Sequence, residues 1–432
     1  MGGVNRTRTA SGVSAGGVSA SGGGPVGANL VAVRSHNAAL VLGLLRDAGA
    51  EGISRLELAE RTGLTPQAVS KITARLREEG FAAEAGRRAS TGGKPRTVLR
   101  LVPEAGHAVG VHLDRDELRV VLVDLDGAVV GERRAELDLG AGAEAVLAVV
   151  GDAVTGVVRE VLGAFPGEEG PGGERAAGEE PAGKGPAGAG SLLGVGVALP
   201  GPLDHARGVL HRVTGFPEWD GFPLRDALGE RLGVPVVVDK DTNAAALGLS
   251  VGGEGSEGGS FAYLHLGTGL GAGLVIGGRV HRGVRTGAGE FGHQVIQLDG
   301  PLCECGNRGC VEALCLAAVG RGEDGEAARV LGVAAANLVG LLDIDVVLLG
   351  GRTIAGAPEG FVRGVGEVLD ARARREGVRG ASVRVAPRGE RVVAEGAAQL
   401  LLAPVFGRGD VRAEGARGTA RPATADPQPR TV

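Results

Sequence analysis

The chain has 432 residues, 43% of them hydrophobic and 22% charged, so it is long enough for two or three domains and apolar enough for a proper core. It contains no apolar run of about twenty residues, so we expect no transmembrane helix and no membrane partner. Residues 1–28 are rich in Gly and Ser and lack the apolar segment of a secretory signal, which predicts a disordered arm on a cytoplasmic protein.

The net charge of −5 conceals a basic segment near the N-terminus. Residues 65–100 contain eight Lys and Arg residues and only three Glu residues. A basic segment in an acidic chain is typical of a surface that binds nucleic acid. Glycine accounts for 81 residues, so a single glycine carries little information and a motif is significant only where several residues stand at fixed spacing.

Two helices are predicted after the arm. The first covers residues 35–48 and places four aliphatic side chains on one face: Leu40, Val41, Leu44 and Leu45. The second begins at Ser54, which forms a capping box with Glu57. It ends near Gly63, because glycine readily adopts the left-handed conformation that follows a helix.

A third helix is predicted to begin with Thr65 as N-cap and Pro66 in the first helical position. The spacing of three apolar side chains predicts that they are buried: Val69, Ile72 and Leu76. Four polar side chains are expected to point outward: Gln67, Ser70, Lys71 and Thr73. Two helices joined by a glycine turn predict a helix-turn-helix, whose second helix reads base edges with its first residues.

The segment after this helix, "FAAEAGRRASTGGKPRTVLRLV", predicts a strand, a basic turn and a second strand. Such a hairpin is a wing, so we place a winged helix-turn-helix domain at residues 29–104. The residues expected to contact operator DNA are Thr65, Gln67, Ser70, Lys71, Arg75, Lys94 and Arg96. The alternative is a small helical bundle with a solvated charged face, but the helix caps, the turn and the basic wing together favour DNA binding.

The rest of the chain, residues 105–404, alternates strand and helix patterns and predicts a two-lobed α/β domain. Two β-hairpins, at 109–124 and 261–277, indicate an internal duplication into similar halves that face a cleft. Residues 166–190 are of low complexity and predict a disordered surface loop, and residues 405–432 are expected to form a disordered tail.

A cluster of one imidazole and three thiols is the most specific pattern in the chain. It consists of His293, Cys303, Cys305 and Cys310. Four ligands of this kind match a closed tetrahedral site for structural Zn2+. The alternatives are a disulfide, which is strained between cysteines two apart, or reduced buried thiols. Cys315 lies outside the pattern and is expected to be a small core residue.

The segment that carries this cluster resembles the signature of the ROK family, which groups repressors, open reading frames and sugar kinases. The matching segments are "GEFGHQVIQLDGPLCECGNRGCVE" (289–312), "GVALPGPLD" (196–204), "FPEWDGFPLRDALGERLGVPVVVDKDTNAAALG" (216–248), "LHLGTGLGAGLVIGGRVHRG" (264–283) and "VVLLGG" (346–351). The resemblance covers roughly residues 29–404 and implies the actin-like, ribonuclease-H-type two-lobed fold. The N-terminal winged helix implies the branch of xylose and N-acetylglucosamine-type repressors.

The resemblance also implies a monosaccharide site. It places on the sugar hydroxyls Asp241, Glu290, His293 and Glu312, with Asp241 at the position that acts as general base in the family's kinases. His293 would bind zinc with one ring nitrogen and the sugar with the other. Lys240 stands where many members have an amide that touches the sugar, so it either contacts an altered ligand or points out of the pocket. Each carboxylate alone could instead cap a helix or form a salt bridge, and it is the whole set that favours sugar binding.

The first hairpin departs from the family pattern. Kinases of the family have Asp-x-Gly-Gly-Thr at this turn, and this chain has His112 for the Asp, Asp114 and Arg115 for the two glycines, and Asp116 for the Thr. Carboxylates beside a triphosphate repel it by several kcal/mol at about 4 Å, so we expect no useful nucleotide binding. The second turn keeps Gly267, Thr268 and Gly269, which we interpret as scaffold for the hairpin.

These features predict a sugar-responsive DNA-binding regulator, a repressor of carbohydrate metabolism, that has no kinase activity. The expected partners are operator DNA, a monosaccharide effector and a second copy of the chain, in a homodimer or a dimer of dimers. One alternative is an ATP-dependent sugar kinase or bifunctional kinase-regulator, which would have to hold the nucleotide with the second turn alone. Another is an architectural DNA-binding protein with an empty cleft.

Overall fold

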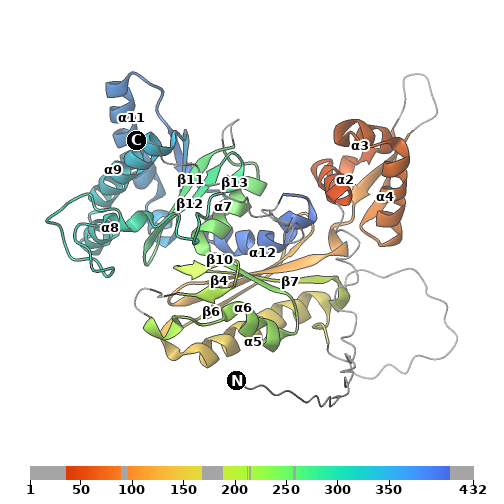
Figure 1. Cartoon of the computed structure of the whole chain (residues 1–432), viewed down its shortest axis with the longest axis horizontal. Helices are drawn as coiled ribbons and strands as arrows, with labels where there is room; N and C mark the ends of the chain where they lie inside the picture. The colour runs from red at the N-terminus through yellow and green to blue at the C-terminus, as the bar shows by residue number, and fades with distance from the viewer. Residues whose placement is uncertain are drawn as a thin grey trace, which may run out of the picture.

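The computed structural model describes residues 36–88, 96–167, 188–211, 213, 216–255 and 259–408. Four predicted features lie wholly or mostly outside the described residues: the N-terminal arm, Lys94 in the wing turn, most of the low-complexity loop, and the C-terminal tail from residue 409. The described chain forms an N-terminal module beside two α/β lobes, which lie one above the other (Figure 1).

The N-terminal module is a winged helix-turn-helix. Its helices are α2 (His36–Asp47), α3 (Arg55–Thr62) and α4 (Pro66–Glu78), and its strands are β1 (Ile53–Ser54), β2 (Ala82–Arg88) and β3 (Arg96–Leu101), in the order β1-β3-β2. Both predicted helix starts are confirmed, because Ser54 forms the capping box with Glu57 and the Thr65 hydroxyl accepts a hydrogen bond from the Ala68 N–H at 3.2 Å. Gly63 ends α3 in the left-handed conformation, as expected.

Two side chains of α4 differ from their predicted burial. Thr73 was expected on the outer face but is fully buried, because its hydroxyl donates to the Val69 carbonyl at 2.8 Å and so needs no water. Ile72 was expected in the core but is only half buried, at the margin of the hydrophobic cluster that contains Val69 and Leu76. The buried row of α4 therefore consists of Val69, Thr73 and Leu76, with Ile72 at its edge.

Lobe I is built on a five-stranded sheet. Its strands are β4 (His107–Leu113), β5 (Glu117–Asp124), β6 (Val129–Glu136), β7 (Leu192–Leu199) and β10 (Val236–Lys240), in the order β10-β7-β4-β5-β6, and a small ribbon pairs β8 (Leu203–Asp204) with β9 (Val209–Leu210). Helices α5 (Ala143–Leu162) and α6 (Leu224–Leu232) cover one face of the sheet (Figure 1). The other face carries α12 (Val392–Val405).

Lobe II repeats this arrangement. Its strands are β11 (Phe261–Leu266), β12 (Leu270–Ile276), β13 (Arg279–Val280), β14 (Val346–Gly350) and β15 (Ser382–Val385), in the order β13-β12-β11-β14-β15. Its helices are α7 (Asp241–Val251), α8 (Val311–Gly320), α9 (Asp324–Leu342), α10 (Arg352–Gly356) and α11 (Pro358–Glu376). Each sheet thus has a three-stranded meander followed by two parallel strands in the same spatial order, so the predicted duplication is confirmed.

One helix of lobe II, α9, is long and apolar enough to cross a membrane by length and composition alone. Half of its apolar window is buried, and it packs against α8 and α11 within the lobe. This is the environment of a core helix.

Helices α7 and α12 cross between the two sheets, and glycines allow their close approach. A Cβ atom on Gly396 would overlap the carbonyl oxygen of Ala244 in α7, and one on Gly248 would lie 2.8 Å from the Gly396 Cα atom. Gly110 and Gly196, on β4 and β7, are equally close to the α12 backbone. No side chain fits at these contacts, so the backbones of α7, α12 and the lobe I sheet pack directly on one another.

The C-terminal end of α12 joins lobe I to the winged-helix module. Phe406 is buried, and the Arg46 guanidinium lies 4.3 Å from the centre of its ring. Arg408 donates to both carboxylate oxygens of Asp47 in α2, at 2.7 and 2.9 Å. The predicted disordered tail therefore does not begin at 405, because Val405 and Phe406 belong to the hydrophobic core.

Candidate functional site

A pocket between the lobes brings together all five side chains that the resemblance assigns to a sugar. They are Lys240, Asp241, Glu290, His293 and Glu312. The same pocket is lined by the second glycine turn and by two residues of the charged first turn, Asp114 and Arg115. Because these segments come from both lobes, any relative movement of the lobes changes the shape of the pocket.

Asp241 occupies the point where β10 ends and α7 begins. The carboxyl end of a parallel strand is where ligands bind in open α/β sheets. Its Oδ1 accepts a hydrogen bond from the Thr242 N–H at 2.6 Å, which fixes the side chain at the helix start. Burial raises the pKa of this carboxyl above its ordinary value, although His265 and Lys240 oppose the rise. A half-buried carboxyl that lines the pocket can accept hydrogen bonds from the hydroxyl groups of a ligand.

Lys240 is buried and does not point out of the pocket. Its Nζ donates to Glu290 Oε1 at 2.7 Å and to the Ala288 carbonyl oxygen at 2.8 Å. Lysine and glutamate thus neutralise one another at the pocket wall. The pair presents a polar surface with little net charge, in place of the amide that the family pattern has at position 240.

The predicted zinc ligands converge. The ligand atoms of His293, Cys303, Cys305 and Cys310 all lie within 4.8 Å of one another. The Sγ atoms of Cys305 and Cys310 are 3.7 Å apart, and Cys303 Sγ lies 3.7 Å from His293 Nδ1. Two Zn–S bonds of about 2.3 Å at a tetrahedral angle separate the sulfurs by about 3.8 Å, so the donor set and its spacing fit a tetrahedral metal ion. The four residues could therefore bind a metal.

The metal cluster and the pocket share side chains. His293 turns Nδ1 toward the sulfurs and also lines the pocket, so a metal bound there would fix the orientation of its ring. Glu312 follows Cys310 in the first turn of α8, and its Oε2 accepts a hydrogen bond from the Leu270 N–H at 2.8 Å. The metal loop, α8 and the second glycine turn consequently form one connected wall.

A buried ion pair at the end of β10 is not indicated by the sequence pattern. Asp239 is 1% exposed and accepts hydrogen bonds from Arg282 Nε at 2.7 Å and from Asn243 Nδ2 at 3.0 Å. The pair ties the end of β10 to the segment after β13 and so fixes the backbone that leads into Asp241. Its partners are more than forty residues apart in sequence, so local spacing gave no signal for it.

Comparison with known proteins agrees with this geometry. The model of the ROK family matches residues 184–319, and a model described as winged helix-turn-helix DNA-binding matches residues 40–81. The ROK hexokinase of Thermus thermophilus is 30% identical, with a TM-score of 0.51 over 68% of this chain and 96% of that one. The chain belongs to the ROK family.

Other ROK proteins extend the likeness to the N-terminal module. The crystal structure of a ROK family transcriptional regulator, a homologue of the Escherichia coli MLC protein, shares the fold with a TM-score of 0.63 over 87% of this chain and 98% of that one, at 19% identity. The xylose repressor of Caldicellulosiruptor bescii is 29% identical over 60% of this chain and 59% of its own length. The N-acetylglucosamine repressor of Escherichia coli is 29% identical over 66% of this chain and 64% of its own. The chain thus spans less than two thirds of these curated relatives.

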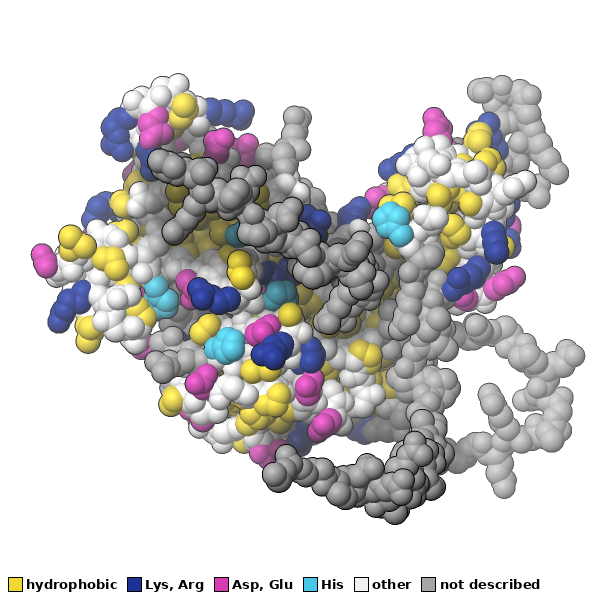
Figure 2. Space-filling model, in the orientation of Figure 1, with side chains coloured by type: hydrophobic (Ala, Val, Ile, Leu, Met, Phe, Trp, Pro, Cys, Tyr) yellow, Lys and Arg dark blue, Asp and Glu magenta, His cyan; other side chains and the backbone are white. Residues whose placement is uncertain are grey.

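The DNA-facing residues predicted for this ROK protein are all exposed where the structure describes them. Gln67, Ser70 and Lys71 lie on the outer face of α4, and Arg96 begins β3. Figure 2 shows Lys and Arg side chains along the edge of the module where Figure 1 places α4. Two of the predicted contacts have internal partners, because Thr65 caps α4 and Arg75 Nε donates to Glu79 Oε1 at 2.9 Å.

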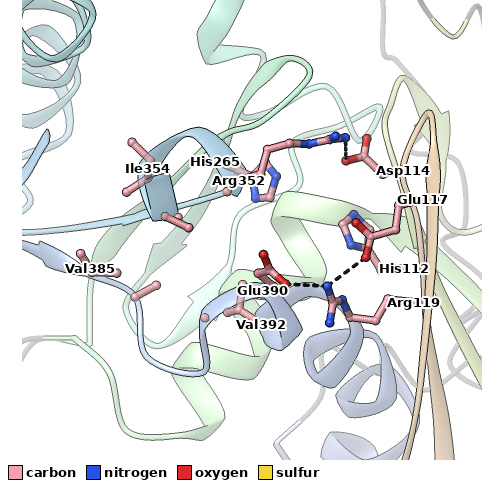
Figure 3. Close-up of a pocket in the computed structure, with 15 residues that line it drawn as sticks. His112, Asp114, Glu117, Arg119, His265, Arg352, Ile354, Val385, Glu390 and Val392 are labelled. Carbon is pink, nitrogen blue, oxygen red and sulfur yellow. Dashed lines mark hydrogen bonds and ion pairs between the residues drawn. The ribbon is translucent and has the colours of Figure 1, made fainter. Parts of the chain in front are cut away.

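The charged first turn of this ROK protein faces the second glycine turn across the pocket. The Thr268 hydroxyl donates to Asp114 Oδ1 at 3.0 Å, so the second turn does more than support its own hairpin. Arg352, at the start of α10, donates to Asp114 Oδ2 at 2.9 Å and to Asp116 Oδ2 at 2.9 Å (Figure 3 shows the pair with Asp114). The sequence pattern indicates the three residues of the first turn but not their partner Arg352, which directly follows the "VVLLGG" segment.

Proposed function

We propose that this ROK protein is a sugar-responsive transcriptional regulator, a repressor of carbohydrate-metabolism genes that binds a monosaccharide without phosphorylating it. The observation that carries the proposal is the single hydrophobic cluster shared by the winged-helix module and lobe I, which joins a DNA-binding module to the sugar-type pocket. The names of the repressors among its relatives support the same conclusion. A regulator of this kind acts inside the cell, where its DNA is.

The pocket supports a polyhydroxylated ligand. Asp241, Glu290 and Glu312 supply carboxylate acceptors, and His293 supplies a ring nitrogen on the side away from the metal cluster. Alternating acceptors and donors suit an array of hydroxyl groups better than an apolar ligand. A structural Zn2+ held by His293 and the three cysteines would supply rigidity to the wall that carries His293 and Glu312.

The absence of kinase activity is supported by the first turn. Asp114 and Asp116 are paired with Arg352, and hydrogen bonds from Arg352 hold the pKa of Asp116 below its ordinary value, so its carboxylate is charged at neutral pH. Phosphoryl transfer requires backbone N–H groups and cations around the phosphates. This turn presents carboxylates there instead.

The link from sugar to DNA is proposed to run through the lobes. Winged-helix regulators bind two-fold operators as dimers, and we propose a homodimer or a dimer of dimers here. A sugar that closes the pocket would move lobe II against lobe I and thereby the two modules of a dimer against each other. The change in DNA affinity cannot exceed the sugar's preference for one arrangement over the other.

A panel of monosaccharides tests the proposal in two assays on the full chain. Thermal denaturation identifies the sugar, because a ligand that binds only the folded state raises the melting temperature. An ATP-coupled assay with the same panel should show no turnover. Clear turnover would favour the kinase, and no thermal shift with any sugar would favour an architectural DNA-binding protein.

The variant Asp241→Ala should lose the sugar response and keep DNA binding. Removal of a charged hydrogen-bonding group costs about 1.5–3 kcal/mol, so we expect about 10- to 100-fold weaker sugar binding. Titration of the identified sugar against the protein–DNA complex measures both effects. Asp226→Ala, an exposed aspartate on α6, is the matched control and should leave both unchanged. Loss of operator binding in Asp241→Ala would contradict the division between sensor and reader.

Lys71→Ala should weaken binding to DNA selected by the full chain from a random duplex pool. Lys71 is exposed in the first half of α4, and we expect about tenfold weaker binding from the loss of one charged contact. If the contact is to a phosphate, the slope of log affinity against log salt should fall by about one. Arg374→Ala, which removes an exposed cation from the last turn of α11, should change neither value. An unchanged affinity in Lys71→Ala would show that α4 is not the reading helix.

A further inference from the structure

All three residues of the charged first turn have partners across the gap between the lobes. Asp114 accepts hydrogen bonds from Thr268 and Arg352, and Asp116 accepts from Arg352. Arg115 Nη1 lies 3.5 Å from Glu304 Oε2, in the metal loop. The turn belongs to lobe I and every one of these partners belongs to lobe II, so the three residues form an ionic connection between the lobes.

The partners of the two carboxylates are groups that commonly bind anions. A guanidinium offers several N–H donors in a plane, and a hydroxyl on a glycine turn can approach an anion closely. Asp114 fills this position from inside, since its side chain is only 15% exposed and both of its carboxylate oxygens accept hydrogen bonds. The anion that these donors hold is thus a part of the protein.

The surroundings keep these carboxylates charged. Burial alone would raise the pKa of Asp114, but His112, which is charged only in acid, and hydrogen bonds from the Arg115 N–H and Arg352 hold it below its ordinary value. Desolvation lowers the pKa of the half-buried His112 to about 4, so it is neutral at neutral pH and adds no competing cation. The single positive charge of Arg352 therefore faces two negatively charged carboxylates, and the local net charge is negative.

We propose that Asp114 and Asp116 are a built-in anion that latches the two lobes and takes the place of a bound polyphosphate. The latch holds the lobes together without any nucleotide, so the sugar pocket forms even when no nucleotide is bound. It also excludes nucleoside triphosphates and pyrophosphate, because their charge would have to displace carboxylates from Arg352 and Thr268. The inference deepens the proposed function but does not depend on which sugar binds.

The decisive variant is Asp114→Asn/Asp116→Asn, which keeps the shape of both side chains and removes their charge. Inorganic pyrophosphate with Mg2+ is the probe, measured by calorimetry on the full chain. The unaltered protein should show no binding at millimolar pyrophosphate. The double variant should bind it, because Arg352 and Thr268 are released. Adding Arg352→Gln to the double variant should abolish that binding, and Arg374→Gln should not.

Hydrogen exchange measures the latch independently of any ligand. Arg352→Gln alone should speed amide exchange in residues 113–118 and 266–270 by about tenfold, the effect of losing one or two charge-assisted hydrogen bonds. Exchange in the C-terminal half of α5, whose buried residues Val154, Val157 and Val158 lie in the core of lobe I, should stay unchanged and shows that the variant is folded. This measurement remains informative should the double variant fail to fold.

Three results would overturn the latch. They are binding of pyrophosphate or ATP by the unaltered protein, no binding of pyrophosphate by the folded double variant, and unchanged exchange in Arg352→Gln. None of these results bears on sugar binding, which the monosaccharide panel tests separately. The two proposals can also fail separately. If no sugar raised the melting temperature, but pyrophosphate bound only after Asp114 and Asp116 were changed to Asn, the latch would stand and the proposed function would be refuted.

Discussion

Cys310→Ser should reduce the metal content from about one zinc per chain to nearly none. Cys310 is fully buried and lies between the metal loop and α8, where it is also the residue that precedes the helix. Loss of one of four ligands opens a closed tetrahedral site, and the folding energy supplied by the ion is lost with it. Because His293 and Glu312 lie on the same wall as the cluster, the thermal shift with the identified sugar should disappear too.

Elemental analysis and thermal denaturation of the purified variant measure these effects. Cys315→Ala is the matched control, because Cys315 is a buried cysteine outside the cluster, in the core of lobe II as the sequence predicted. It should keep the metal and the sugar response and lose only packing. Retention of a full equivalent of zinc in Cys310→Ser would show that the cluster is not the metal site.

Gly396→Ala should destabilise the protein by at least about 3 kcal/mol, at or beyond the usual range for overpacking. The added methyl group would overlap the Ala244 carbonyl oxygen, and backbone atoms cannot turn aside as a side chain can. Helices α7 and α12 must separate to admit it, which loosens the packing of both lobes on α12. Urea denaturation monitored by circular dichroism gives the free energy of unfolding.

Gly366→Ala provides the comparison on another helix. Gly366 lies in α11, and no heavy atom is close to the position of its missing Cβ. Alanine favours the helix by about 1 kcal/mol over glycine, so this variant should be as stable as the unaltered protein or more so. Equal stability of the two variants would mean that the α7–α12 contact is looser than its geometry indicates.

The sequence predicted those features that depend on neighbouring residues. The capping box of Ser54 and Glu57 and the cap at Thr65 involve groups three residues apart, so their pattern is visible in the chain. Thr73 shows the limit of such patterns. A threonine inside a helix can satisfy its hydroxyl on its own backbone, and nothing in the helical period distinguishes that case from an exposed one.

The candidate site was predictable as a set of residues but not as a set of pairings. The four metal ligands fall within eighteen residues, and their donor types alone indicated a metal. Arg352 could not be found in this way, because its partners Asp116 and Asp114 lie 236 and 238 residues earlier and follow no local rule. Lys240 was placed correctly at the pocket, but only the structure shows that Glu290 neutralises it.

The cluster that includes Leu42, Leu45, Leu402 and Phe406 has a consequence for how such a protein can be altered. The winged-helix module is therefore not an independent unit that can be cut at residue 104 and joined to another ROK domain. A fragment that ends there would expose the apolar side of α2, and a chimera would need α2 and the end of α12 to be exchanged together. The surfaces that we propose to bind DNA and sugar can therefore diverge freely, while the junction between them has to change as a unit.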